Sequence, residues 1–94
     1  MKAVLILYDK HTRPNGNVVE MKIWKVPVTK DKPLGYKYSL AYIVKSRRVI
    51  GYDNAEGKRD HKHFREKEDI YNFKNITKLI DDFYKDIIEF ERSK

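Results

Sequence analysis

The hydrophobic pattern of this chain changes once, from a period of two residues in its first half to the period of an α-helix near its C-terminus. The helical part is an apolar stripe with the spacing i, i+3, i+4, i+7. It comprises Ile76, Leu79, Ile80, Phe83, Tyr84, Ile87 and Ile88. We predict a helix from about Ile76 to Glu91, with Asn75 as its N-cap. Burying the stripe stabilises the fold by roughly 10–20 kcal/mol before the entropy cost, so we expect the helix to cover the sheet.

The period-two segments predict strands that are separated by turns. The predicted strands are residues 3–8, 18–28, 36–45 and 48–53. Asn15-Gly16 is typical of a tight hairpin turn, because this pair tolerates the positive φ angles that such a turn requires. The sequence therefore predicts a single α+β domain, residues 1–94, in which an antiparallel meander of about four strands carries a C-terminal amphipathic helix packed on one face.

Aromatic residues interrupt this scaffold in two places. Tyr36, Tyr38 and Tyr42 share one face of their strand. Such a row most often packs under a helix, although in a basic sheet it could also stack nucleic-acid bases. Trp24 belongs to the preceding strand and is a candidate exposed aromatic that could cap the core or contact a partner.

The charge of the chain points to a polyanionic or acidic partner. Its 94 residues include 21 Lys and Arg against 14 Asp and Glu, a net charge of +7. The excess lies in residues 1–53, which carry 11 cations and 4 anions, whereas residues 54–94 carry 10 of each. A composition rich in Lys and Glu and free of Gln is also typical of thermophilic proteins, which need not bind nucleic acid.

Two features of the sequence exclude certain kinds of site and of targeting segment. Cysteine is missing, which excludes disulfides, a thiolate nucleophile and a Cys-type zinc site. The apolar run at residues 3–8 is too short for a signal peptide or a membrane span. We expect a cytoplasmic protein that has no membrane partner.

The most unusual segment is residues 51–65, because its fifteen residues hold two of the three histidines, four cations and two aspartates. If residues 60–65 are extended, successive side chains alternate between two faces. One face then carries Asp60, Lys62 and Phe64, and the other His61, His63 and Arg65. This alternation predicts two imidazoles and a guanidinium side by side.

Such a group suits the cleavage of RNA by its own 2′-hydroxyl, which needs a base, an acid and cations for the phosphorane charge. His61 and His63 can serve as base and acid near neutral pH, and Asp53 or Asp60 can orient an imidazole. No metal or other cofactor is required. The side chains expected to bind phosphate or nucleic acid are Lys58, Arg59, Lys62, Arg65, Tyr52 and Asn54.

Two other interpretations stay open. His61 and His63 could be exposed residues of a charged loop that has no chemistry. They could also hold a transition metal together with Asp53 or Asp60, since imidazoles at i and i+2 of a strand can converge on one ion. The cations nearby raise the cost of binding a divalent ion, so we expect no metal.

The segment resembles the signature of the TumE-like family of toxins. The resemblance rests on Tyr52-Asp53-Asn54-Ala55, Gly57-Lys58 and Asp60-His61-Lys62-His63. The matching positions are Tyr52, Asp53, Asn54, Gly57, Lys58, Asp60, His61 and His63. Length and element order agree as well, with strands before the motif and a helix containing Asp81-Asp82-Phe83 after it.

The resemblance implies the toxin of a type II toxin–antitoxin pair, with a DNA-binding antitoxin as partner and RNA as target. The leading hypothesis is a metal-independent ribonuclease. The alternative is a non-catalytic module that binds nucleic acid or the antitoxin, and self-association is left open.

Overall fold

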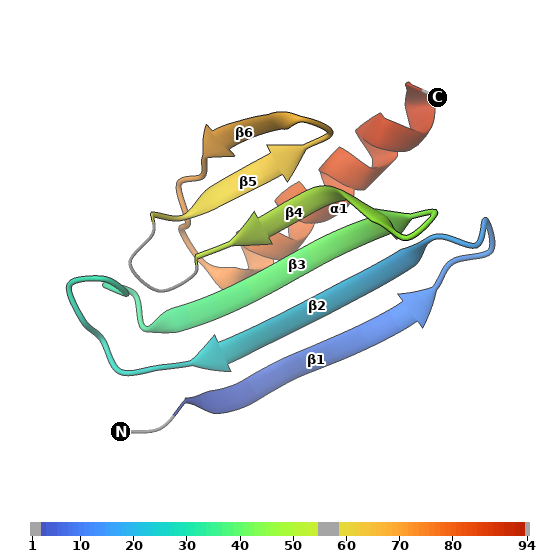
Figure 1. Cartoon of the computed structure of the whole chain (residues 1–94). Coiled ribbons are helices and arrows are strands. Elements are labelled where there is room, and N and C mark those ends of the chain that lie inside the picture. Colours follow the sequence, from blue (N-terminus) through green and yellow to red (C-terminus); the bar gives the residue numbers. More distant parts are fainter. Residues whose placement is uncertain (1–2, 55–58, 94) are drawn as a thin grey trace.

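The computed structural model describes residues 3–54 and 59–93, and it confirms the α+β class. Its elements are β1 (Val4–Thr12), β2 (Val18–Lys25), β3 (Tyr36–Val44), β4 (Arg47–Asp53), β5 (His61–Phe64), β6 (Lys67–Ile70) and α1 (Ile76–Arg92). Each strand pairs antiparallel with the next, so the sheet is a meander with the order β1-β2-β3-β4-β5-β6. The helix crosses one face of the sheet, behind β3 and β4 in Figure 1. We call the other face, which no described helix covers, the open face.

The expected number of about four strands is wrong, because β5 and β6 add a hairpin at one edge of the sheet (Figure 1). Arg65 and Glu66 connect the two strands, and Arg65 has the positive φ of 59° that tight two-residue turns favour. The strand sequences HKHF and KEDI consist mainly of polar and charged residues. The alternation of apolar and polar residues that marks β2 and β3 is therefore absent from this hairpin.

The helix agrees closely with its prediction. It begins at Ile76, and the Asn75 side chain accepts a hydrogen bond from the Lys78 backbone N–H at 2.8 Å, as expected of an N-cap. Phe90 is buried, whereas Ile88 is 53% exposed, so the buried stripe leaves its predicted course near the C-terminal end. Within residues 3–54 and 59–93, no helix combines the length and the apolar character needed to cross a membrane.

The core lies between α1 and the helix-facing side of the three central strands. The buried sheet residues are Val19, Met21, Ile23, Tyr38, Leu40, Tyr42, Ile50 and Tyr52. Tyr38 and Tyr42 are 1% and 0% exposed, so they pack in the core and are closed to nucleic-acid bases. Trp24 is half-buried under the Lys37 ammonium group, which lies 5.6 Å from its ring centre.

Tyrosine hydroxyls connect the sheet to the elements around it. Four of them donate hydrogen bonds to carboxylates, in the pairs Tyr38–Asp60, Tyr42–Glu91, Tyr52–Asp86 and Tyr71–Asp82. Three of these carboxylates belong to α1, so the hydroxyls fasten the helix to the rest of the fold. Burial, and then the hydrogen bond to the carboxylate, raise the pKa values of Tyr38, Tyr52 and Tyr71 far above the usual value.

Candidate functional site

The two histidines of β5 lie side by side on the open face. The antiparallel pairing of β4 with β5 sets His61 opposite Asp53 and His63 opposite Gly51. Their ring centres are 5.3 Å apart, as expected of side chains two residues apart on one strand. The predicted juxtaposition of the two imidazoles is thus present in the structure.

Both ring nitrogens of His61 face hydrogen-bond acceptors. Nδ1 donates to the Arg59 backbone carbonyl at 2.9 Å, since a carbonyl can only accept. Nε2 lies 3.1 Å from Asp53 Oδ1 and 3.5 Å from Glu68 Oε2. The side chain is only 13% exposed, so these contacts hold the ring in one orientation.

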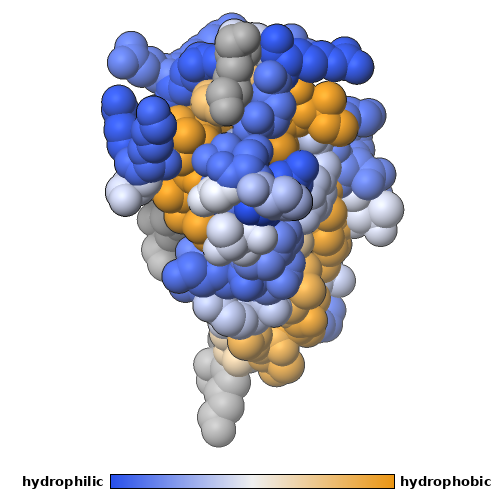
Figure 2. Space-filling model, turned by 90° about the vertical axis from the view of Figure 1, so that its right-hand side faces the viewer, coloured by the Kyte–Doolittle hydropathy of each residue, from blue (hydrophilic) through white to orange (hydrophobic). Residues whose placement is uncertain are grey.

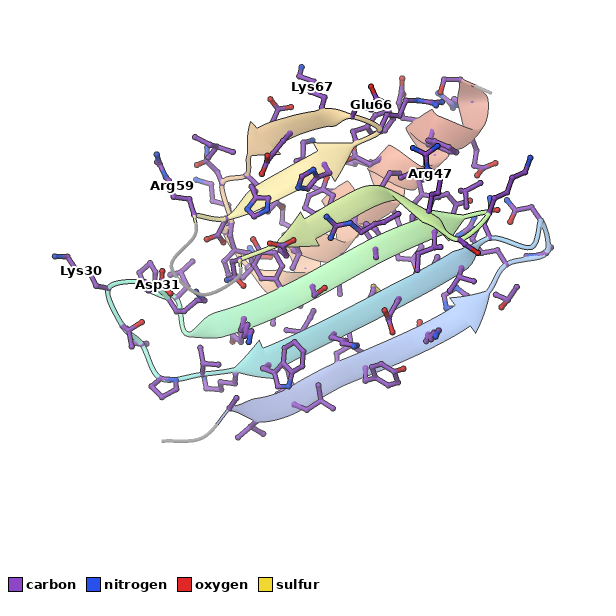
Figure 3. The ribbon with its side chains drawn as sticks, viewed as in Figure 1. Lys30, Asp31, Arg47, Arg59, Glu66 and Lys67 are labelled. Carbon is purple, nitrogen blue, oxygen red and sulfur yellow. The ribbon has the colours of Figure 1, made fainter. Side chains whose placement is uncertain are left out.

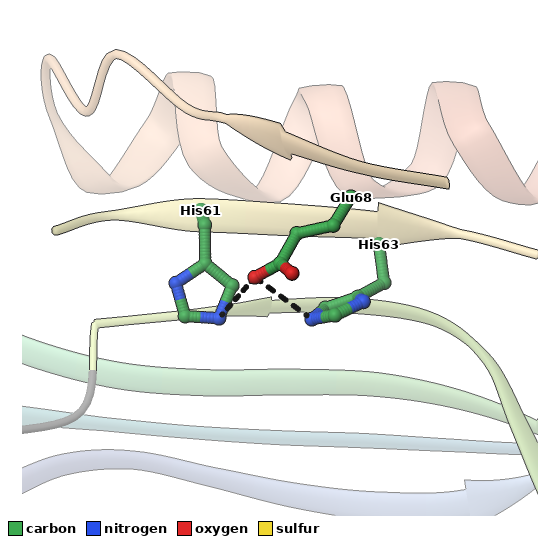
Figure 4. A group of neighbouring side chains, drawn as sticks. All are labelled: His61, His63 and Glu68. Atoms are coloured by element: carbon green, nitrogen blue, oxygen red, sulfur yellow. Dashed lines mark ion pairs between the residues drawn. The ribbon is translucent and has the colours of Figure 1, made fainter. Parts of the chain in front are cut away.

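Glu68 was absent from the predicted site residues, yet it lies between the two rings (Figure 4). It belongs to β6 and pairs with His63, and its Oε2 is 3.6 Å from His63 Nε2. Its side chain is exposed, and that of His63 is half-buried. Predicting the β5–β6 hairpin and its strand register from the sequence would have identified Glu68, because directly opposed residues on neighbouring strands share a face.

Arg48 is the second residue that sequence reasoning missed. A β-bulge at Val49 shifts the β3–β4 register, so that Arg48 and Gly51 lie on the same face. The Arg48 guanidinium crosses Gly51, where an added Cβ would lie 2.9 Å from Arg48 Cζ, and its Nη1 reaches 3.6 Å from Asp53 Oδ2. Glycine at position 51 thus leaves room for a cation beside Asp53.

Two of the predicted phosphate ligands lie away from the imidazoles. Lys62 faces the helix, where its Nζ is 3.6 Å from Asp86 Oδ2. The Arg65 guanidinium stacks 4.4 Å from the Phe90 ring centre and donates to Ser93 Oγ at 3.0 Å. The expectation that Arg65 shares the face of the histidines is therefore wrong, because β5 ends at Phe64 and the turn redirects the next side chain.

Arg59 and Asp60 precede β5. Arg59 is exposed and lines a hollow of about 460 Å³ together with His61 and Glu68. Figure 3 shows Arg59 projecting from the start of β5, at the same end of the sheet as Lys30. The Asp60 carboxylate instead accepts from the Tyr38 hydroxyl at 2.8 Å on the helix side, so it does not orient an imidazole. Gly57 and Lys58 lie outside the described residues.

Tyr52 and Asn54 of the signature are buried, with exposed fractions of 0% and 2%, so neither can reach a phosphate. Asn54 directly follows β4 and continues its pairing with β3 through its side chain. Its Oδ1 accepts from the Tyr38 backbone N–H at 2.9 Å, and its Nδ2 donates to the Tyr36 carbonyl at 2.8 Å. Its side-chain amide thus replaces the backbone of a further strand residue.

The substitution Asn54→Ala is expected to lower the free energy of unfolding by about 1–3 kcal/mol, because it removes the partner of the buried Tyr38 N–H and of the part-buried Tyr36 carbonyl. Urea denaturation measures the loss. Asn72→Ala is the matched control, since Asn72 is exposed. Equal stability of the two variants would contradict the bridging role of Asn54.

The donor set also permits metal ligation. His61, His63 and Glu68 each offer one ligand atom, and these three atoms lie within 4.8 Å of one another. The site therefore combines two imidazoles, two nearby carboxylates and the Arg48 guanidinium on an accessible sheet surface.

Comparison with known proteins identifies the family. No curated protein and no solved structure matches the chain. The family model described as toxin TumE matches residues 4–91, nearly the whole chain, and so includes β4, β5 and the signature between them. The chain belongs to the TumE family of toxins.

Proposed function

We propose that this toxin cleaves RNA by metal-independent acid–base catalysis, with His61 and His63 as the proton-transfer groups. The observation that carries the proposal is the imidazole pair on the open face, in which Asp53 holds one ring at 3.1 Å and the other ring lies 3.6 Å from Glu68. Acting on RNA would place the toxin in the cytoplasm.

The contacts of the two rings suggest different roles. His61 has an acceptor at each ring nitrogen, which is the hydrogen-bonding pattern of a protonated ring, so it is the candidate acid. The Nε2 atom of His63 is 3.6 Å from Glu68, longer than the hydrogen-bond range of about 2.7–3.2 Å. His63 can therefore accept a proton from a substrate and is the candidate base.

The proposed reaction begins when His63 takes the proton of a 2′-hydroxyl, whose oxygen then attacks the adjacent phosphorus. The bond from phosphorus to the 5′-oxygen breaks as His61 donates a proton to that oxygen. The products are a 2′,3′-cyclic phosphate and a free 5′-hydroxyl. Positioned proton transfer of this kind contributes about 10²–10⁴-fold to a rate.

Arg48 and Arg59 are the cations best placed to stabilise the phosphorane. Arg48 reaches the Asp53 carboxylate across Gly51 with its side chain 42% exposed, and Arg59 lines the hollow beside His61. A guanidinium forms strong charge-assisted hydrogen bonds to phosphate oxygens. Arg59 keeps the role that the sequence suggested for it, and Arg48 takes the role suggested for Lys62 and Arg65.

The sheet offers a surface on which a single RNA strand can lie. The cross-strand row through His63 continues over Gly51 to Ala41, and the row through His61 continues over Asp53 to Ser39. Ser39 and Ala41 carry short side chains and the Arg48 guanidinium lies across Gly51, so the backbone of a substrate that approaches from β3 would meet Arg48 beside the imidazoles. Proteins that bind single-stranded nucleic acid without sequence preference contact unpaired bases in this way.

The test uses purified, metal-stripped toxin in the presence of EDTA. We expect a single-stranded RNA to be cut into fragments that end in a 2′,3′-cyclic phosphate. The same sequence made as DNA should stay intact, because it lacks the attacking hydroxyl. Equal cleavage of the RNA and the DNA, or the absence of any RNA cleavage, would refute the mechanism.

A non-catalytic binding module is the second candidate, and the exposed edge strand β1 favours it. Apolar side chains at Val4, Leu5, Ile6 and Tyr8 are between 47% and 58% exposed. Figure 2 shows apolar surface continuing down to the end of the molecule where β1 lies. An unpaired strand edge can add a strand from a partner, and a toxin family implies an antitoxin as that partner.

A further inference from the structure

We propose that His61, His63 and Glu68 form a binding site for one divalent transition-metal ion of the Zn²⁺ class, and that the ion blocks the proposed RNA cleavage. The first half of this proposal depends only on the geometry of the three side chains (Figure 4). The second half rests on the proposed function.

The two distances from Glu68 to the imidazoles fit a shared metal ion better than they fit hydrogen bonds. Glu68 Oε2 is 3.5 Å from His61 Nε2 and 3.6 Å from His63 Nε2. Tetrahedral Zn²⁺ holds each N or O ligand about 2.0–2.2 Å away, which separates neighbouring ligand atoms by roughly 3.3–3.6 Å. A carboxylate that accepted from either ring would lie at about 2.7–3.2 Å instead.

The backbone holds these ligands in place. His61 Nδ1 donates to the Arg59 carbonyl, which directs Nε2 toward Glu68, and metal-bound histidines commonly show this second hydrogen bond. His63 follows two residues later on the same strand, and Glu68 is its partner on β6. Three protein ligands leave a fourth position for water.

The charge around the cluster also favours a cation, contrary to the expectation from the sequence. Two carboxylates, those of Asp53 and Glu68, lie within 3.6 Å of the imidazole nitrogens. Lys62 and Arg65 lie on the helix side, Arg48 is paired with Asp53, and Arg59 lines the adjoining hollow. Two imidazoles and a carboxylate are a ligand set that Zn²⁺ accepts readily.

Metal binding and proton transfer would compete for the same atoms. The ion takes the lone pairs of both Nε2 atoms, so His63 could no longer accept a proton and His61 would release the one it donates. The metal-loaded toxin would therefore lack both the base and the acid of the proposed reaction.

The experiment titrates Zn²⁺ into the metal-stripped full chain by calorimetry and compares Glu68→Gln with Asp69→Asn. Asp69 is the matched control, because it is an exposed carboxylate on the same strand that pairs opposite Lys62. We expect the parent and Asp69→Asn to bind one equivalent. Glu68→Gln should bind at least about tenfold more weakly, since even groups that merely support ligands are worth that much.

RNA cleavage is measured on the same three proteins. Each rate is compared with the rate of the same protein without metal, and Zn²⁺ should inhibit the parent and Asp69→Asn at concentrations that leave the rate of Glu68→Gln unchanged. Absent binding, or equal affinity in Glu68→Gln and Asp69→Asn, overturns the metal site. Cleavage that requires Zn²⁺ supports the site but overturns the inhibition. Site-dependent binding by a protein that never cuts RNA supports the site and refutes the proposed function.

Discussion

Replacing His63 by alanine is expected to slow RNA cleavage by about 10²–10⁴-fold, the usual contribution of a positioned proton-transfer group. The side chain is half-buried on the open face opposite Gly51, so the fold should survive the change. Initial cleavage rates of metal-stripped protein measure the effect. Loss of growth inhibition when the variant is expressed without antitoxin is the matching result in cells.

His11→Ala is the control for this experiment. His11 is the third histidine, and it is exposed on β1 with its ring nitrogen 2.9 Å from Asp9, far along the sheet from β5. We expect its activity to equal that of the parent. If both His61→Ala and His63→Ala cut RNA as fast as the parent, acid–base catalysis by these residues is wrong. Salt-sensitive RNA binding by proteins that never cut RNA would favour the binding module.

The regular parts of the fold were predictable because their sequences alternate clearly. Residues of β2 and β3 follow the period of two that a half-buried strand requires, and the stripe before Ile88 follows the period of a helix. The hairpin β5–β6 was not predictable by this means. It lies at the edge of the sheet, where Phe64 packs against the core but backbone pairing and charge contacts involve the other residues, so no apolar pattern marks it.

The site was predictable only as far as one strand reaches. Alternation along β5 correctly separated His61 and His63 from Lys62. It failed at Arg65, where the strand has ended and a φ of 59° turns the chain. Glu68 belongs to the neighbouring strand β6, so only the register between β5 and β6 shows that it lies beside His63.

Arg48 shows a different limit. In a regular strand Arg48 and Ile50 would share one face, but the bulge at Val49 puts Arg48 on the open face while Ile50 stays in the core. A bulge is not marked by an apolar pattern, so a period-two assignment puts this cation on the wrong side. The absence of a side chain at Gly51 is explained only by the structure, in which the Arg48 guanidinium lies across this residue.

The tyrosine–carboxylate pairs predict a steep loss of stability in alkali. An unfolded tyrosine ionises near pH 10, whereas burial and the hydrogen bonds to Asp60, Asp86 and Asp82 raise the pKa values of Tyr38, Tyr52 and Tyr71 far above that value. Below pH 10 both states are protonated and the stabilisation is fully present. Above it the unfolded state loses protons that the folded state keeps, so the free energy of unfolding falls by about 1.4 kcal/mol per pH unit for each tyrosine.

Three such groups together should lower the free energy of unfolding by up to about 4 kcal/mol between pH 10.5 and 11.5. Guanidinium denaturation at a series of pH values measures the slope. The variant Tyr71→Phe isolates the contribution of one tyrosine, because it removes the hydroxyl that donates to Asp82. Its slope should be smaller by about one third, because one of the three groups no longer ionises in the unfolded chain. A slope unchanged by Tyr71→Phe would mean that the buried hydroxyls do not set the alkaline limit of this fold.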